Sequence, residues 1–188
     1  MCPEFIRPEA DPAGKKYVTF VNVLRYIIKV VKFRSFYNRY KDMLFAYLMR
    51  ASGDYYLSGD IMQESFTRYL DRYGKSEPSA PLLFKIARNA LLDHRRKSNR
   101  STQLQEENEP KGENPEHHLM VRDEYRRTLS AMQQLAEAER DVLSLVVSSD
   151  MSYRKIAEIQ HTSEQNVKVR VHRARVKLRK ILGGRDQK

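Results

Sequence analysis

The side chains best suited to chemistry lie in the stretch from Ser163 to Leu182, and the chemistry that they suit is the binding of nucleic acid. Amide side chains such as Gln165 and Asn166 can form paired hydrogen bonds with adenine in the major groove. Lysine and arginine side chains can neutralise phosphates. The candidates for base edges are Gln165, Asn166, Lys168, Val169 and His172, and those for phosphates are Arg170, Arg173 and Arg175.

These side chains need a helix that carries them on its outer side. Apolar residues recur at steps of three and four along the same stretch, which predicts a helix with an inward apolar stripe. The stripe consists of Val167, Val171, Ala174, Leu178 and Leu182. Ser163 precedes the stripe, and a serine hydroxyl at that place can accept a first-turn N–H group and cap the helix.

A shorter helix is expected just before this one. Ser152 can cap it, Ile156 and Ala157 form a small inward face, and the slim Ala157 lets a second helix cross closely. Two capped helices joined by a short turn, the second basic on its outer face, are the parts of a helix-turn-helix. The alternative is an ordinary helical hairpin whose charged face is only solvated.

The composition favours a polyanionic partner and an all-α fold. The 188 residues carry a net charge of +11 and have a sequence pI of about 9.8, which suits nucleic acid or an anionic membrane surface. Cys2 is the only cysteine, so no intrachain disulfide can form and a reducing compartment is expected. Few stretches alternate with period two, which predicts helices throughout.

The apolar stretch 17–36 does not have the pattern of a membrane span. Arg25, Lys29 and Lys32 interrupt it, which argues against both a transmembrane helix and a secretory signal. We expect a core helix of the first domain, with a basic helix lying on a membrane surface as the alternative. The protein is therefore expected in the cytoplasm.

Two further helices are expected to carry polar side chains that could bind partners. On the helix after Ser58 or Gly59, Asp60, Gln63 and Glu64 recur at helical steps, although solvation alone could explain them. The next helix has Pro81 in its first turn and ends in a basic cluster suited to phosphates or to the helix dipole. Its candidates for nucleic-acid contact are Lys85, Arg88, Asn89, Arg95 and Arg96.

The expected architecture is all-α, with two small helical domains joined by a flexible acidic linker, the C-terminal one carrying the helix-turn-helix. The ranges are a flexible N-terminal arm at 1–14, a first domain at 15–100, a linker at 101–118, a second domain at 119–183 and a tail at 184–188. The linker combines five glutamates with two prolines and a glycine, a composition that does not build a packed core.

We expect no enzyme, no cofactor and no metal. Asp93 and His94 are adjacent in sequence, so a helix points them in different directions and they are a poor catalytic pair. His117 and His118 lack further ligands at a spacing that would bind a metal.

Two blocks of the chain resemble one known family. GDYYLSGDIMQESFTRYL followed by LLFKIARNALLDHRRK resembles conserved region 2 of the extracytoplasmic-function (ECF) sigma factors of bacterial RNA polymerase. The stretch from Leu135, LAEAERDVLSL and then SYRKIAEIQHTSEQNVKVRVHRARVKLRKIL, resembles their region 4. The resemblance spans Phe33 to Leu182 in the family's order and separation. A lone helix-turn-helix is a weak signal, but the two regions together are specific.

The resemblance implies a sigma factor that binds core polymerase, directs it to promoters and assists promoter melting. It implies that the helix after Ser163 reads the −35 element and that the basic helix from Leu82 meets the −10 element. It also implies that Asp60, Gln63 and Glu64 dock on the β′ clamp helices, with the β flap as a further polymerase contact and an anti-sigma factor as another partner. The alternative function is a stand-alone helix-turn-helix regulator that does not associate with polymerase.

The chain also departs from the family pattern. Leu82 stands where a tryptophan is usual, Ala136 where proline is common, and Lys155 where an acidic residue would complete a capping box. Gln160 and His161 replace a usual Leu-Gly, so His161 must accept a left-handed backbone. Capturing unstacked bases usually requires aromatic rings. The candidates are Tyr73 and Phe84, with a place in the core as the alternative for each.

Overall fold

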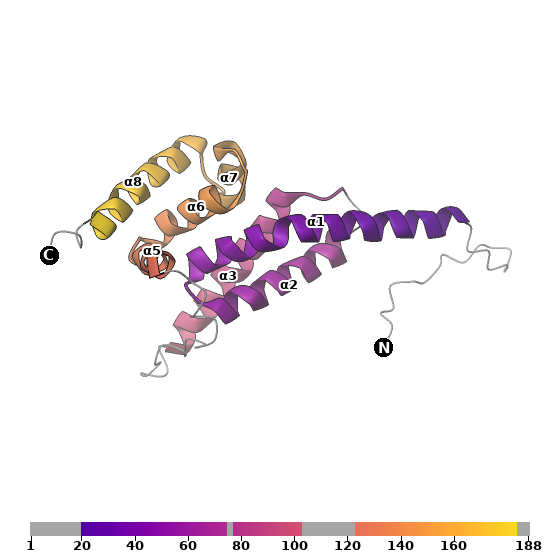
Figure 1. Cartoon of the computed structure of the whole chain (residues 1–188), viewed down its shortest axis with the longest axis horizontal. Helices are drawn as coiled ribbons and strands as arrows, with labels where there is room; N and C mark the ends of the chain where they lie inside the picture. Colours follow the sequence, from indigo (N-terminus) through magenta and orange to yellow (C-terminus); the bar gives the residue numbers. More distant parts are fainter. Residues whose placement is uncertain (1–19, 75–76, 103–122, 184–188) are drawn as a thin grey trace.

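The structure is a computed structural model that describes residues 20–74, 77–102 and 123–183. All of the regular structure in these ranges is helical, which confirms the all-α prediction (Figure 1). The helices are α1 (Phe20–Ser52), α2 (Tyr55–Tyr73), α3 (Ala80–Thr102), α5 (Asp123–Gln133), α6 (Glu137–Ser148), α7 (Tyr153–Gln160) and α8 (Glu164–Gly183). The predicted arm at 1–14, nearly all of the linker and the tail at 184–188 lie outside the described residues.

Helix α1 extends well beyond the core helix expected at 17–36, because the apolar spacing continues through Phe36, Tyr40, Leu44 and Leu48. No proline or glycine falls between Phe20 and Ser52, so nothing in the backbone breaks the helix. It ends at Gly53, which adopts a left-handed conformation with φ of 78°, as glycine commonly does after a helix. The first turns of α1 extend beyond α2 and α3, and Val31 is 60% exposed (Figure 1). The prediction of a core helix therefore holds only from the buried Phe36 onward.

Helix α2 begins earlier than the predicted start at Ser58 or Gly59. Asp54 caps it, because its Oδ1 accepts a hydrogen bond from the backbone N of Leu57 at 3.0 Å. Ser58 is fully buried, and its hydroxyl donates to the backbone oxygen of Asp54 at 2.5 Å. The prediction was wrong because Asp54, four residues upstream, offers the better cap.

The first three helices pack around an aromatic core. Phe36 of α1 lies 5.2 Å from Tyr69 and 6.3 Å from Phe66 of α2, between ring centroids. Leu83 and Leu91 of α3 close the same core and are at most 2% exposed. Burial of several large side chains in this cluster supplies the main driving force for the first domain.

Helices α7 and α8 form the predicted helix-turn-helix. The hydroxyl of Ser152 accepts from the backbone N of Lys155, and that of Ser163 accepts from the backbone N of Asn166 at 3.1 Å. His161 adopts the predicted left-handed backbone, with φ 51° and ψ 49°, and its N–H donates to the end of α7. Both predicted caps and the strained turn are therefore confirmed.

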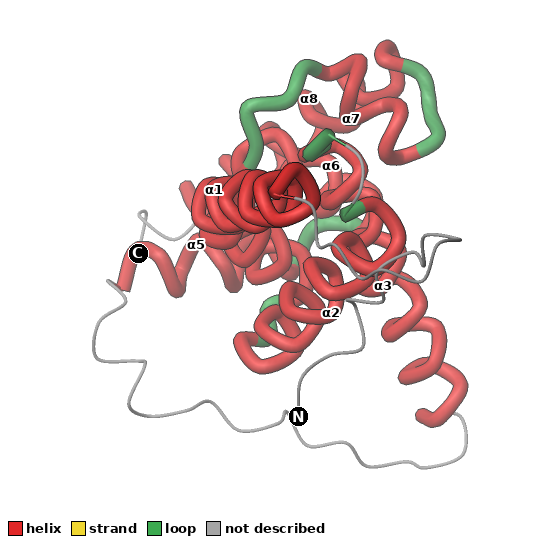
Figure 2. Tube along the Cα trace, turned by 90° about the vertical axis from the view of Figure 1, so that its right-hand side faces the viewer, coloured by secondary structure: helices red, strands yellow, loops and turns green. Residues whose placement is uncertain are grey.

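The two predicted domains pack against each other. Helix α1 contacts α2 and α3 on one side and α5 and α6 on another (Figure 2). A single apolar cluster joins Leu44 and Leu48 of α1 to Val142 and Leu145 of α6. A smaller cluster, which includes Met132 and Leu143, holds α5, α6 and α8 together. The described residues thus form two helical units that share a continuous core.

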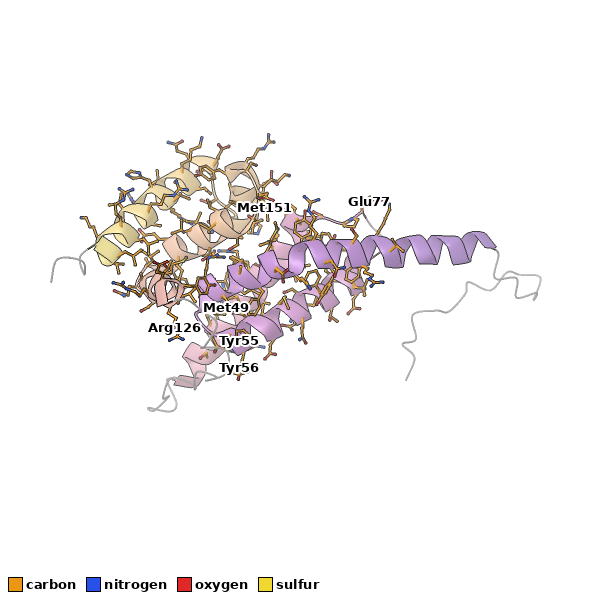
Figure 3. The ribbon with its side chains drawn as sticks, viewed as in Figure 1. Met49, Tyr55, Tyr56, Glu77, Arg126 and Met151 are labelled. Atoms are coloured by element: carbon orange, nitrogen blue, oxygen red, sulfur yellow. The ribbon has the colours of Figure 1, made fainter. Side chains whose placement is uncertain are left out.

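A side-chain contact closes this junction at the end of α1. The side chain of Gln133 on α5 donates to the backbone oxygen of Arg50 at 3.1 Å and lies against the bare Cα of Gly53. Figure 3 places Met49, Tyr55 and Tyr56 on this side of the molecule, where Arg126 of α5 also lies.

Among the described residues, no helix is long and apolar enough to cross a bilayer.

Substitution of His161 by glycine tests the strain in the turn. We expect His161→Gly to raise the free energy of unfolding by about 0.5–1 kcal/mol, because glycine adopts a positive φ without a steric cost. Urea denaturation followed by circular dichroism measures the change. His161→Ala is the matched control, since it removes the exposed imidazole but keeps the strain. Equal stability of the two variants would show that the left-handed turn costs nothing.

Candidate nucleic-acid interface

The outer face of α8 carries nearly all the predicted −35 candidates. The buried residues Val167, Val171 and Ala174 turn the helix so that its opposite side faces solvent. Arg170 is partly covered by its neighbours. The exposed candidates are Gln165, Asn166, Lys168, Val169, His172, Arg173 and Arg175. The sequence pattern thus predicted which side of this helix is accessible.

Local hydrogen bonds order the first turn of α8. The side-chain amide of Asn166 donates to the Thr162 hydroxyl at 3.2 Å, which holds the Asn166 amide at the start of the helix. The Lys168 ammonium lies 2.9 Å from a carboxylate oxygen of Glu164, one turn earlier. Both groups remain exposed, so a polyanion could take over these weak surface contacts.

Helix α8 is fixed to the helices beneath it. Its Val167 and Val171 pack with Ile156 and Ile159 of α7 in the main core. The Lys177 ammonium lies 2.8 and 2.9 Å from the two carboxylate oxygens of Glu139 on α6. Because the Glu139 side chain is only 11% exposed, this ion pair is better shielded from water than those on the surface. A rigid support holds a recognition helix in one orientation, as base reading requires.

The predicted −10 candidates on α3 are divided between surface and interior. Asn89 and Arg96 are exposed and Lys85 is partly covered. Arg88 and Arg95 instead point into the junction with α6, where both form ion pairs. The structure therefore brings α3 to the surface with only part of its predicted basic set accessible.

Asp141 of α6 is the partner of Arg88 and the centre of a buried hydrogen-bond group. Its carboxylate accepts from Arg88 Nε at 2.6 Å, from the Tyr47 hydroxyl at 2.8 Å and from Gln160 Nε2 at 3.0 Å. Burial, and then the adjacent Asp141 carboxylate, raise the pKa of the Tyr47 hydroxyl. Tyr47 therefore stays protonated and donates to Asp141. Sequence reasoning missed this residue, which stands directly before the apolar run from Val142 to Val146 and follows two other charged residues.

Arg95 forms a second set of contacts across the same junction. Its Nη1 lies 2.8 Å from Glu137 Oε1 of α6, and its Nη2 donates to the backbone oxygen of Ala51 at the end of α1. Nearby, Arg50 Nη1 donates to the Ser148 hydroxyl at 2.7 Å. Basic residues of the first unit thus meet acceptors of α6 along much of its length.

The polar stripe Asp60, Gln63 and Glu64 is exposed on α2. Glu64 pairs with Arg68 one turn later. A groove of about 600 Å³ runs beside the stripe, between α2 and α3, and its lining includes Asp60, Glu64, Asp93 and His94. Packing between the two helical units therefore leaves this surface accessible.

Two other expectations concern aromatic rings and metals. Phe84 is fully buried beside Tyr47, so of the two readings left open for it the place in the core is the one the structure shows. Tyr73 is partly buried and packs 5.8 Å from Tyr69, between ring centroids. Within the described ranges, the structure gathers no group of three histidine, cysteine or carboxylate side chains able to hold a metal.

Described residues that are helical in all their regular structure, with an exposed basic helix in a helix-turn-helix and a second helical unit packed against it, define a helix-turn-helix protein of the transcription machinery. Residues 36–101 match the family model for sigma-70 region 2, and residues 125–178 match that for sigma-70 region 4. The two regions together cover more than half of the sequence. The chain therefore belongs to the sigma-70 family of RNA polymerase sigma factors, in its extracytoplasmic-function group.

Its curated relatives support this assignment. The chain is 26% identical over 153 residues to the ECF RNA polymerase sigma factor SigM of Bacillus subtilis, covering 77% of this chain and 91% of SigM. It is 29% identical over 140 residues to the ECF sigma factor EcfG of Rhodopseudomonas palustris, covering 73% of this chain and 77% of EcfG. The family is one of transcription initiation factors that bind core RNA polymerase and promoter DNA, so the alternative of a stand-alone regulator is set aside.

Solved structures share the fold. The sigma factor RpoE of Bartonella quintana, solved with the anti-sigma factor NepR, superposes with a TM-score of 0.68 at 22% identity and covers 80% of this chain and 96% of RpoE. CnrH, solved with the cytosolic domain of CnrY, gives a TM-score of 0.60 at 22% identity and covers 81% of this chain and 88% of CnrH.

Removal of positive charge from the outer face of α8 tests its role. We expect Lys168→Ala and Arg173→Ala each to weaken promoter binding, and loss of a phosphate contact to lower the slope of log K against log salt by about one. Fluorescence anisotropy across a salt series measures both effects. Lys180→Ala, in the last turn of the same helix, removes the same charge away from these residues. If all three variants behaved alike, α8 would contribute only general electrostatic attraction.

Proposed function

We propose that this sigma factor holds a promoter with two sets of side chains, one on each unit. On the region 4 unit, α8 enters the major groove of the −35 element. Its base contacts come from Gln165, Asn166, Lys168, Val169 and His172, and its phosphate contacts from Arg170, Arg173 and Arg175. The observation that carries this proposal is that the outer face of α8 is exposed and basic, while its apolar side is buried beneath.

On the region 2 unit, α3 and the loop before it meet the −10 element. The residues assigned to that contact are Lys85, Arg88, Asn89, Arg95 and Arg96. Asn89 and Arg96 are accessible as the chain stands, which supports a role for this face of α3. Cationic side chains along one helix can follow the backbone of a separated strand, as promoter melting requires.

The exposed stripe Asp60, Gln63 and Glu64 is the proposed docking surface for the β′ clamp helices of the polymerase. The β flap is the proposed polymerase contact of the region 4 unit. As a polymerase subunit the protein would act in the bacterial cytoplasm, on the nucleoid when bound. RpoE, which shares the fold, was solved with an anti-sigma factor, and we extend that kind of partner to this chain.

Run-off transcription with purified core enzyme tests the proposed function directly. We expect the chain to direct core polymerase to a defined set of start sites on genomic DNA from its own source, and mapping of those sites gives the −35 and −10 sequences. Absence of any sigma-dependent transcript with active core enzyme would contradict the proposal.

Changes in the α2 stripe test polymerase docking separately. We expect Asp60→Ala and Gln63→Ala to weaken association with core enzyme without loss of helical content, because both side chains are exposed and outside the core. Co-elution with core polymerase and circular dichroism measure the two properties. Asp71→Ala removes an exposed carboxylate near the end of the same helix and is the control. Unchanged co-elution of all variants would place the docking surface elsewhere.

A further inference from the structure

The two proposed DNA-binding faces differ in what their arginines contact. On α8, Arg173 and Arg175 are exposed to solvent. On α3, Arg88 and Arg95 lie against α6 of the other unit, with side-chain exposures of 17% and 22%. With the two units packed together, the outer face of α8, proposed for the −35 element, is therefore accessible. Two of the arginines on α3 proposed for the −10 element are held in ion pairs instead.

The carboxylates bind these two arginines through hydrogen bonds that phosphate groups could also form. Asp141 receives Arg88 at 2.6 Å and Glu137 receives Arg95 at 2.8 Å. Guanidinium groups bind carboxylate and phosphate oxygens through the same charge-assisted hydrogen bonds. A phosphate of promoter DNA and a carboxylate of α6 cannot hold the same guanidinium group in the same place. The two anions must therefore compete.

The carboxylate of Asp141 is not easily displaced while the units stay packed. Its side chain is 8% exposed, and it also accepts from Tyr47 of α1 and Gln160 of α7. Water cannot replace these donors unless α6 and α7 move away from α1 and α3. Separation of a buried pair leaves both charges without partners, which makes partial opening unfavourable.

We propose that α6 acts as an internal competitor of promoter DNA, in which Asp141 and Glu137 hold Arg88 and Arg95 until the two units separate. This inference rests on the proposed role of α3 at the −10 element. The α8 face and the stripe Asp60, Gln63 and Glu64 remain exposed in the closed chain. Polymerase docking and −35 binding can therefore precede release of the α3 arginines, and −10 binding follows separation.

Neutralising the two carboxylates should release the α3 arginines. We expect Asp141→Asn with Glu137→Gln to raise affinity for a single-stranded oligonucleotide carrying a mapped −10 element by about fivefold or more, the lower end of ordinary site–site coupling. Affinity for a −35 duplex should stay within about twofold of the wild type, since α8 is already accessible. Equal gains on both probes would overturn the competitor role, because they would report only the lost negative charge.

Glu158→Gln controls for the loss of one negative charge and is matched to the single variant Glu137→Gln. Glu158 is exposed on α7 and pairs with Lys155 of the same helix. Its substitution therefore removes one negative charge from the region 4 unit without changing a contact of α3. A fivefold gain with this control as well would also overturn the proposal. The single variant Glu137→Gln, at an exposed residue, keeps the test valid if the loss of the buried Asp141 charge unfolds the chain. It should give a smaller gain on the same −10 probe.

A covalent lock tests the converse. A Cβ on Gly53 would lie within 2.8–3.1 Å of side-chain atoms of Gln133 across the junction, so cysteines at these two positions face each other closely enough to test for a disulfide. In a Cys2→Ser background, we expect Gly53→Cys with Gln133→Cys to cross-link under oxidation. The oxidised chain should bind a −35 duplex but lose run-off transcription, and reductant should restore it.

The reduced form of the same protein controls for strain at Gly53, where φ is 78°. Equal transcription by the oxidised and reduced forms, or failure of the cysteines to cross-link, would overturn the competitor role and leave the sigma function standing. Absence of transcription from the wild-type chain itself would instead contradict the proposed function.

Discussion

A carboxylate on a side chain only 8% exposed must find donors within the protein, and Asp141 finds them on three other helices. Tyr47 contributes from α1, Arg88 from α3 and Gln160 from α7, so one side chain of α6 joins both units. Loss of a single partner from such a buried pair costs about 3–5 kcal/mol. The apolar core around Asp141 excludes water from the pair, and the pair in turn fixes how the apolar surfaces meet.

The same interaction explains the uneven state of the two proposed DNA-binding faces. Helix α8 lies on the outer side of α6 and α7, where the Glu139–Lys177 pair fixes it. Lys168, Arg173 and Arg175 of this helix are exposed among the described residues. Helix α3 faces the inner side of α6, and its arginines become part of the junction. In the proposed function, this arrangement would separate polymerase docking and −35 recognition from −10 recognition.

Local signals in the sequence predicted the local structure well. The caps at Ser152 and Ser163, the left-handed His161 and the exposed side of α8 all follow from residue type and helical spacing. Errors arose where two residues could each cap the same helix, as Asp54 and Ser58 could for α2. They also arose where no glycine or proline ended a helix, as in α1. For Phe84 the sequence left base stacking and a place in the core open, because helical spacing does not say which neighbour covers a ring.

The junction between the units could not be predicted in this way. Arg88 and Asp141 are 53 residues apart, and neither has a local pattern that names the other. The basic cluster on α3 correctly indicated that these side chains bind anions. It did not show which anion, since phosphate and carboxylate groups attract the same side chains. Only the tertiary arrangement distinguishes them.

The ion pair between Glu139 and Lys177 has a geometric consequence for promoter choice. Because it joins α8 to α6 beside the apolar contact of Leu143 with Ala174, the helix proposed to read DNA and the helix that carries Asp141 are expected to move together. The number of base pairs between the two promoter elements would then set the distance between α3 and the pair of helices α6 and α8. A spacer that is too short would leave the carboxylates beside their arginines, so spacer length itself becomes part of what the protein selects.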